Sequence, residues 1–378
     1  MSTNVITKRP DIQGARAPGK LILSGEHSVV YGAPALVVAL AHHIEIWFTP
    51  LHKTRGLKTV FENLATSAFY PFDLLKDFKE SLDRRFDDFM RGELPVQEIL
   101  QKPDDLAIYT LTSLLPNLPM PGGSSNLPLP LPVPGQLTSR SEMPLGAGMG
   151  SSASVVAATV VLYEHLLGRP QSVEERFQKV RFCERLQHGR GSSIDASAVV
   201  FGGMNRVQGE DIRPIQIDQD HSIARSDGWY WVQQGTPISK TGECVSQVRA
   251  QHGQNAALWQ EFTACTEAFE DVIRNDSDPR DVIRENHRLL SHIGVVPNPA
   301  ARFATAVEDL GGAAKISGAG AVRGDHGGVM LVYLPDEEAM AELMSAYPER
   351  RWEKLSMARE GAALCTDQSN YAERTAAQ

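Results

Sequence analysis

The stretch "GAGMGSSAS", residues 146–154, combines alternating glycines with two serines and leads directly into a long apolar run. Glycines at 146, 148 and 150 leave backbone N–H groups open to a ligand, because no Cβ stands in the way. The serines fall where a helix would begin, and the free N–H groups of a helix N-terminus favour phosphate. A hydroxyl there can also reach a magnesium ion that bridges phosphates. By itself, the stretch predicts either a phosphate cradle or a tight structural turn.

The loop differs from two common phosphate-binding patterns. It lacks the G-x-G-x-x-G spacing of dinucleotide-binding loops, and no lysine follows its last glycine as in a Walker A motif. A second stretch, "GARAPGKL" (14–21), nearly spells a Walker A motif, but Leu21 stands where the magnesium-binding hydroxyl belongs. Pro18 also removes one of the N–H groups that such a loop uses. A P-loop NTPase is therefore disfavoured.

Three further stretches place ionisable residues in or beside glycine-containing turns. They are "APGKLILSGEHSVVYGAPAL" (17–36), "CERLQHGRGSSIDASAVVFGG" (183–203) and "AAKISGAGAV" (313–322). The ionisable residues singled out in the first two are Lys20, Glu26, His27, Glu184 and Asp195. Together with "PLGAGMGSSAS" (144–154), the three stretches resemble, in this order, the motifs of the GHMP kinase superfamily. Within it they are most similar to the mevalonate kinases, which carry a PGK…GEH-x-VV-x-G run.

This resemblance covers nearly the whole chain apart from roughly residues 51–140. It implies a mixed α/β (α+β) fold with the two-domain architecture of that superfamily. Residues 1–220 would form an N-terminal domain like domain 2 of ribosomal protein S5 (ribosomal-S5-domain-2-like), and residues 221–378 a ferredoxin-like α+β domain. The implied activity is an ATP- and Mg²⁺-dependent phosphorylation of a small alcohol, with mevalonate, converted to 5-phosphomevalonate, as the favoured acceptor.

The resemblance also implies a role for each matching position. Phosphoryl transfer needs a phosphate cradle, a metal, charge stabilisation and a group that accepts the hydroxyl proton. Asp195 would be the general base and Lys20 would stabilise the developing alkoxide, while Ser152 and Glu184 would be magnesium ligands. The acceptor would contact Lys20, Glu26, His27 and Asp195. The nucleotide would contact Pro144, Gly146, Ala147, Gly148, Met149, Gly150, Ser151, Ser152, Ala153, Thr241, Gly318 and Gly320.

Most of these residues also have an ordinary structural interpretation. Asp195, which follows two serines, could cap a helix, and Thr241 could do the same. Lys20 could be an edge-strand charge. His27 could serve only to shape its turn.

Glu184 could pair with Arg181 or Arg185 at the protein surface. It follows Phe177 by seven residues, however, so the two share one stripe of a helix and Glu184 is expected to face inward. A buried unpaired carboxylate is costly, so a metal or a cationic partner is expected beside it.

Departures from the family pattern concern the acceptor. Arg190–Gly191 stand where mevalonate kinases often have Asn-Pro, Ser193 replaces a common glycine, and Arg323–His326 interrupt the last glycine run. These positions lie near the region that sets substrate selectivity, so phosphomevalonate kinase or a sugar kinase remains an alternative. A non-catalytic nucleotide- or sugar-binding sensor is a further alternative, although such a protein would usually have lost Asp195 or Lys20.

Hydrophobic patterns predict the elements that position these residues. Apolar runs predict strands at Lys20–Leu23, Ala35–Ala39 and Ile44–Phe48. Charged and apolar residues repeat at helical spacing between Asp73 and Leu100, which predicts an amphipathic helix. The proline-rich stretch Leu115–Gln136 cannot donate a full set of ladder hydrogen bonds, so we expect a loop or an edge-strand excursion there.

The second half of the sequence predicts alternating helices and strands. A helix at Ala153–Gly168 ends in glycine, and the next helix begins with a capping box, Ser172 to Glu175. A composition break near Asp218–Asp227 suggests the domain boundary. The remaining predictions are strands at "WYWVQQ" and "GGVMLVYL", a glycine-rich strand followed by a loop at "AAKISGAGAV", and helices near Thr241–Gln251, Ala256–Arg274 and Arg280–Ile293.

Composition limits the classes of function. The formal net charge of -9 argues against a general nucleic-acid binder, although an acidic chain can still bind ATP at one local site. Four scattered cysteines without a CxxC pair are typical of reduced thiols. No run approaches the roughly 18 apolar residues of a membrane span, and the N-terminus lacks a signal-peptide core. We therefore expect a cytoplasmic protein without a membrane partner; a homodimer stays open.

Overall fold

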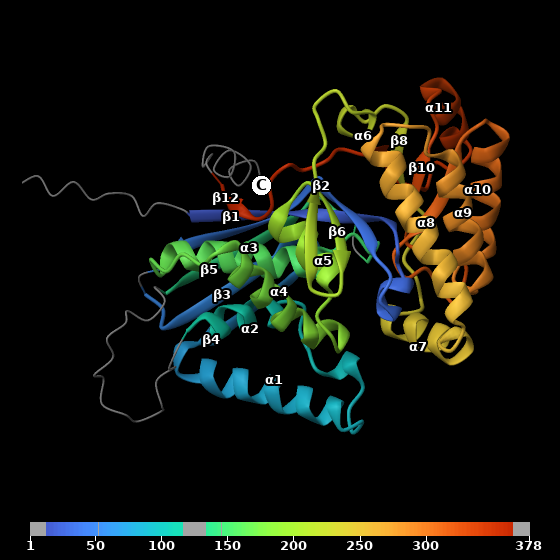
Figure 1. The fold of residues 1–378 in the computed structure, drawn as a ribbon. Helices are drawn as coiled ribbons and strands as arrows, with labels where there is room; N and C mark the ends of the chain where they lie inside the picture. Colours follow the sequence, from blue (N-terminus) through green and yellow to red (C-terminus); the bar gives the residue numbers. More distant parts are fainter. Residues whose placement is uncertain (1–12, 52, 116–133, 145, 366–378) are drawn as a thin grey trace, which may run out of the picture.

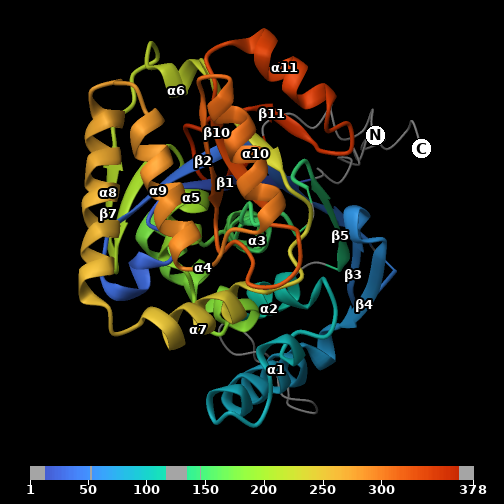
Figure 2. The same cartoon turned by 90° about the vertical axis from the view of Figure 1, so that its right-hand side faces the viewer.

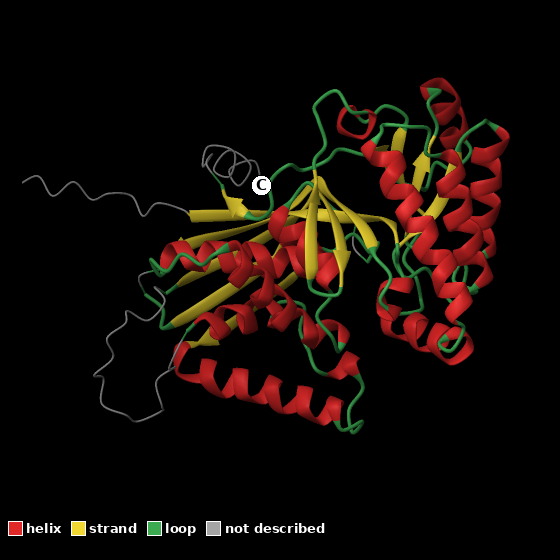
Figure 3. Cartoon of the chain, in the orientation of Figure 1, coloured by secondary structure: helices red, strands yellow, loops and turns green. Residues whose placement is uncertain are grey.

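A computed structural model describes residues 13–51, 53–115, 134–144 and 146–365. The chain forms two β-sheets, each accompanied by its own group of helices (Figures 1 and 3). The predicted mixed α/β character is therefore confirmed. None of the helices in these ranges is long and apolar enough to cross a bilayer.

The larger sheet contains the N-terminal strands and carries the first of the singled-out residues. Its main path runs β12 (Ala363–Leu364), β1 (Gln13–Ser24), β2 (Ala35–Pro50), β5 (Gly135–Ser141), β3 (Gly56–Phe61) and β4 (Thr66–Pro71). Off this path, β6 (Met204–Gln208) pairs with β2 and with β7 (Asp211–Ile215). The pairings are antiparallel except that of β3 with β5.

Two predicted boundaries in this sheet are wrong. Ala35–Ala39 and Ile44–Phe48 belong to one strand, β2, because the register of β1 against β2 shifts between Pro18 and Gly19 without ending the pairing. Such an irregularity accommodates extra residues in one strand of a pair. In the proline-rich stretch, residues 116–133 lie outside the described ranges, but Gly135 and Gln136 belong to β5, which lies between β2 and β3.

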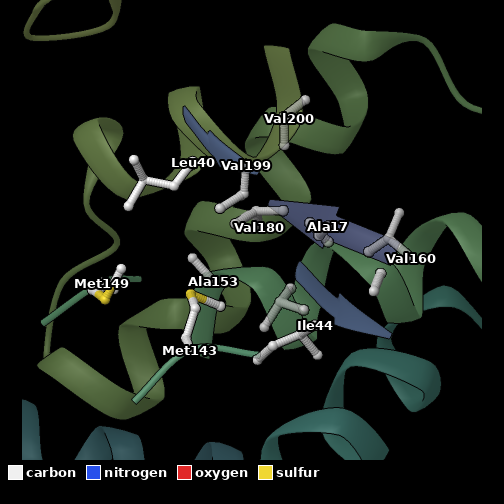
Figure 4. Close-up of a cluster of buried hydrophobic side chains, with 14 of the residues drawn as sticks. Ala17, Leu40, Ile44, Met143, Met149, Ala153, Val160, Val180, Val199 and Val200 are labelled. Carbon is white, nitrogen blue, oxygen red and sulfur yellow. The ribbon is translucent and has the colours of Figure 1, made fainter. Parts of the chain in front are cut away.

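Helix α3 (Ser151–Leu166) packs on β1 and β2 and is the central helix of this half. It is apolar nearly all round, as expected of a helix enclosed by other elements. Figure 4 shows its Ala153 and Val160 among side chains from β1, β2 and the neighbouring helices. The helices around it are α2 (Asp105–Leu114), α4 (Val173–His188) and α5 (Ser193–Phe201), with the amphipathic α1 (Leu75–Met90) packed on α2.

The smaller sheet is antiparallel and runs β11 (Trp352–Lys354), β8 (Trp229–Gln233), β10 (Val329–Tyr333) and β9 (Ala313–Ser317). Its helices are α7 (Thr241–His252), α8 (Ala256–Arg274), α9 (Arg280–His292), α10 (Asn298–Asp309) and α11 (Glu337–Ser345). Three of them, α8, α9 and α10, run alongside one another in Figure 1, with α7 below them and α11 above, and Figure 2 shows the same helices turned by 90°. The three helices predicted here are confirmed to within a residue, and α10 and α11 were not predicted.

Short helical turns connect these elements. They are η1 (Ser28–Tyr31), η2 (Glu62–Leu64), η3 (Phe72–Leu74), η4 (Val96–Glu98) and the short helix α6 (Ser222–Arg225). The predicted capping box of α4 is present, since the Ser172 side chain accepts from the Glu175 N–H and the Glu175 carboxylate accepts from the Ser172 N–H. Local hydrogen bonding therefore starts α4 at the predicted residue.

Candidate active site

A cleft of about 480 Å³ collects side chains and backbone from elements of both sheets. The glycine loop and β1 form one part of its wall, the ends of α4 and α5 another, and the loops before α7 and after β9 a third. The lining residues are Lys20, Val96, Gln97, Leu100, 146–152, Leu186, Gln187, His188, Asp195, 236–237, 239–242, Ser317, Ala319, Gly320, Gly327 and Gly328.

The glycine loop has the backbone conformation that its sequence suggested. Gly146, Gly148 and Gly150 have φ values of 68°, 81° and 79°, in the left-handed region that favours glycine. Alternation of left-handed residues with ordinary ones directs N–H groups into a concavity that suits an anion. Helix α3 begins immediately afterwards at Ser151, so its N-terminus adds free N–H groups at the same place.

The same loop is held against β1. The Lys20 N–H donates a hydrogen bond to the Met149 carbonyl at 2.9 Å. A Cβ on Gly150 would lie 2.8 Å from Lys20 Cγ, so the absence of a side chain allows the lysine to pass close to the loop. The β1 lysine and the candidate phosphate cradle are therefore built as one unit.

Lys20 and Asp195 form an ion pair at the cleft, with 3.1 Å between Lys20 Nζ and Asp195 Oδ1. Their side chains are 7% and 19% exposed, so the pair is shielded but not sealed. The cap of α5 is Ser192, whose hydroxyl accepts from the Asp195 N–H at 3.2 Å. Asp195 is thus not the capping residue, and Lys20 is not a solvated edge charge.

The charge of Asp195 is set by opposing effects. Burial would raise the pKa of its carboxyl, but the nearby Lys20 and His188 charges and the hydrogen bonds from Lys20 and Ser192 outweigh burial. The net result holds the pKa of Asp195 below its ordinary value. The carboxylate is therefore ionised at neutral pH and able to accept a proton.

Glu184 faces inward, as its helical position predicted, and is 1% exposed. The Ser152 hydroxyl donates to its Oε2 at 3.0 Å, and His188 Nε2 lies 3.5 Å from the same oxygen. The arginines that could have held it at the surface pair elsewhere, Arg181 with Glu210 and Arg185 with Asp83. The two predicted metal ligands, far apart in sequence, are brought into contact.

These two residues fit a magnesium ion. Glu184 Oε1 is buried and has no hydrogen-bond partner in the described part of the chain, so one carboxylate oxygen remains available. Mg²⁺ is commonly held by one or two carboxylates together with substrate phosphates and water. In the described ranges, no cluster of three or more His, Cys, Asp or Glu side chains could hold a metal. A magnesium ion held by Ser152 and Glu184 would complete its coordination shell with phosphate oxygens and water.

Glu26 and His27 lie behind the cleft instead of on its wall. Among the described residues, neither belongs to the lining set. The Glu26 carboxylate pairs with Lys315, and His27 Nε2 lies 3.1 Å from the Ala319 carbonyl. Burial lowers the pKa of His27 to about 4, against the hydrogen bond to Ala319, so this imidazole is neutral at pH 7.

The remaining predicted nucleotide contacts divide into two groups. Thr241 and Gly320 line the cleft, and Thr241 is the first residue of α7, whose cap is Lys240. Pro144, Ala153 and Gly318 are not among its described lining residues. Ala153 is buried in the core beside Met143 and Met149 (Figure 4).

Sequence reasoning missed several lining residues. His188 follows Glu184 by four residues on α4, a spacing that places both on one helix face and could have revealed it. Val96 and Gln97 in η4 and Thr236 before α7 carry no comparable local signal. They reach the cleft only through the packing of their elements.

Comparison with known proteins supports the assignment made from the motifs. Residues 125–203 match the family described as GHMP kinases N terminal domain. A mevalonate kinase from Thermococcus onnurineus is 24% identical over 337 residues, covering 86% of this chain and 90% of the relative. A phosphomevalonate kinase from Streptomyces sp. (strain CL190) is 27% identical over 379 residues, covering 89% and 93%.

A solved structure gives the same result for the fold. The Methanococcus jannaschii mevalonate kinase aligns with a TM-score of 0.71 at 19% identity, covering 93% of this chain and 99% of that one. The predicted two-domain fold is therefore confirmed. So is the resemblance to the GHMP kinase superfamily, and within it to the mevalonate kinases.

Proposed function

We propose that this homologue of the GHMP kinases transfers the γ-phosphoryl group of ATP to a small alcohol, with mevalonate as the favoured acceptor. The observation that carries the proposal is the Lys20–Asp195 pair, 3.1 Å apart and facing the same cleft as the glycine loop. A proton acceptor, a fixed positive charge and a candidate phosphate cradle thus meet in one cleft, as phosphoryl transfer to a hydroxyl requires.

The chemistry of the chain's own residues follows from this arrangement. Asp195 would accept the proton of the acceptor hydroxyl as its oxygen attacks the γ-phosphorus and the bond to the β-phosphate oxygen breaks. Lys20 would keep Asp195 ionised and stabilise negative charge on the attacking oxygen. The backbone N–H groups of residues 146–152 would bind the phosphate groups of ATP and orient them.

Magnesium would be held by Ser152 and Glu184 together with phosphate oxygens of the nucleotide. When bound, it would neutralise phosphate charge and align the γ-phosphoryl group. The Ser152–Glu184 hydrogen bond holds both oxygens at the start of α3 before any ion binds. The buried, unpartnered Oε1 of Glu184 supports this placement.

The acceptor has one serious alternative. The Streptomyces phosphomevalonate kinase is as similar to this chain as the mevalonate kinase is, at 27% against 24% identity. Arg323–His326 directly precede Gly327, which lines the cleft, and Arg190 follows the cleft-lining His188 by two residues. Phosphomevalonate is therefore the second candidate acceptor.

We also propose that the chain divides into domains at residues 1–220 and 221–378. The existence of two separate sheets supports this division. Strand β12 (Ala363–Leu364) pairs with β1 of the larger sheet, so these two residues would return to the first domain.

An assay of ADP release with a panel of alcohols tests the proposed activity. Purified protein is incubated with Mg·ATP and mevalonate, phosphomevalonate, galactose or homoserine, with Asp195→Asn as the matched control. We expect mevalonate to give the highest kcat/KM, and a higher value with phosphomevalonate would transfer the assignment to it. Absence of ADP release with every alcohol would contradict kinase function and favour a nucleotide- or sugar-binding sensor.

A further inference from the structure

A second lysine–carboxylate pair lies directly behind the cleft. Lys315 of β9 and Glu26 of the turn after β1 form an ion pair whose side chains are both 0% exposed. Lys315 Nζ also lies 3.4 Å from the Ile22 carbonyl, to which it donates a hydrogen bond. The pair therefore joins the smaller sheet to the end of the first strand of the larger sheet.

A neighbouring hydrogen bond repeats this connection. The Ile22 N–H donates to Ser317 Oγ at 2.8 Å. Because residues two apart on a strand point to the same side, Lys315 and Ser317 present one face of β9 to β1. The N–H and the carbonyl of Ile22 are thus both held by side chains of β9. These two hydrogen bonds to one residue fix the distance between β1 and β9 and also how far one strand is offset along the other.

The segment from Ile22 to Glu26 that is held in this way is flanked in sequence by residues at or beside the cleft. Lys20 precedes Ile22 by two residues on the same strand. His27 follows Glu26 and contacts the Ala319 carbonyl at 3.1 Å. Both Ser317 and Ala319 line the cleft. A displacement of the Glu26 turn would therefore shift Lys20 against the loop after β9.

Stability alone does not account for a sealed pair at this place. Burial of two charges costs about as much as their attraction returns, and well-packed apolar residues of similar volume are often equally stable there. Burial in fact lowers the pKa of the Lys315 ammonium, with Glu26 opposing that shift. What a directional ion pair does supply is a fixed geometry between two elements.

We propose that Lys315 is a positioning residue of the acceptor site, which holds Glu26 and Ile22 so that Lys20 and Asp195 meet the acceptor hydroxyl in the correct geometry. This inference rests on the proposed kinase function and deepens it. It also changes the part expected of Glu26: the carboxylate holds Lys315 and does not contact the acceptor.

The test compares neutralisation of this sealed pair with neutralisation of a buried carboxylate in a partly exposed ion pair outside the cleft. The double variant Glu26→Gln/Lys315→Met removes both charges and leaves none unpaired, so it should fold even if the single variants do not. The control is Glu164→Gln, because Glu164 is buried and bonded to Arg176 at 2.7 Å but lies outside the cleft lining. Both proteins are compared with the wild type in steady-state kinetics and in amide hydrogen exchange.

We expect the double variant to lose about tenfold to a hundredfold in kcat/KM for mevalonate, since small misplacements of reacting groups have effects of this size. The KM for ATP should change less than kcat/KM for mevalonate, because the Lys20 N–H to Met149 hydrogen bond and the left-handed glycines of the loop are left in place. Exchange should become faster in peptides covering residues 20–32 and 313–322, and not in the control.

Two results would overturn the inference. One is a mevalonate kcat/KM in the double variant that equals that of Glu164→Gln. The other is unchanged hydrogen exchange in both peptides. A wild-type protein inactive toward every alcohol would instead contradict the proposed function, and the exchange comparison would still decide whether the pair fixes the turn.

Discussion

Two lysine–carboxylate pairs of this chain have the same chemical partners but different surroundings. Lys20–Asp195 lies on the cleft wall, with side chains 7% and 19% exposed, whereas Lys315–Glu26 is sealed at 0% on both sides. In the first pair, the pKa of Asp195 lies below its ordinary value, because the charges of Lys20 and His188 outweigh burial. In the second, burial dominates and lowers the pKa of Lys315.

This difference indicates what each pair can do. A carboxylate that is ionised and reachable from a cleft can accept a proton from a substrate. A carboxylate with no solvent access and a lysine against it can only hold elements together. Lys20, Asp195 and Glu26 belong to motifs that the resemblance placed at the acceptor, whereas Lys315 precedes glycines that it placed at the nucleotide. Exposure and not residue type separates the chemical pair from the positioning pair.

The largest expected effect is a loss of turnover when the Lys20–Asp195 pair on the cleft wall is changed. Asp195→Asn keeps the side-chain size and removes the base, so kcat should fall by roughly 10²–10⁴-fold. Nucleotide affinity, measured by titration with a fluorescent ATP analogue, should stay nearly unchanged because the glycine loop is intact. Turnover close to that of the wild type would remove Asp195 from the role of base and leave positioning and charge stabilisation as the mechanism.

The next largest expected effect is a difference between the two pairs in the free energy of unfolding lost when each carboxylate is replaced. Glu26→Gln leaves Lys315 buried without its ionic partner, which costs about 3–5 kcal/mol when a buried pair is broken. Because burial already lowers the pKa of Lys315, deprotonation of the lysine should keep the cost near the lower end. Asp195→Asn should cost less, because its pair borders the cleft with side chains 7% and 19% exposed, so that water in the cleft can solvate the Lys20 ammonium left behind. Urea unfolding of both variants measures the two losses of unfolding free energy. Equal losses would contradict the distinction between a sealed pair and a pair at the cleft.

A smaller loss of kcat is expected when Lys20, the lysine of the cleft-wall pair, is replaced. Lys20→Met should lower kcat by about 10²-fold, since one stabilising donor is lost. Combined with Asp195→Asn, it should lose less than the product of the two single effects, because groups that act as a unit are not additive. Fully multiplicative losses in the double variant would show that the two residues act independently.

The smallest expected effect is the pH dependence of stability. Since the folded pKa of Asp195 lies below its unfolded value near 3.9, its ionised form stabilises the fold above about pH 4, and this stabilisation disappears as pH falls through the folded pKa. The Tm difference between wild type and Asp195→Asn should therefore be larger at pH 5 than at pH 3. A difference that grows on acidification would reverse the assigned direction of the pKa shift.

Much of the local structure was predictable. The capping box of α4, the inward position of Glu184 and the extents of α7, α8 and α9 follow from caps and periodicity, which act between residues a few positions apart. Prediction failed where sheet pairing decides the structure. The end of the proline-rich stretch entered β5 between β2 and β3, and two predicted strands proved to be the single strand β2.

Within the site, the sequence by itself determined the left-handed glycine loop, the helix that begins after it, and the presence of Lys20, Glu184 and Asp195. These features depend on glycine's freedom at positive φ and on helix ends, which are local properties of the chain. Only the tertiary structure decided which lysine meets which carboxylate. Glu26 and Lys315 are 289 residues apart, and desolvation depends on every element packed around a charge, so no local pattern distinguishes the sealed pair from the one at the cleft.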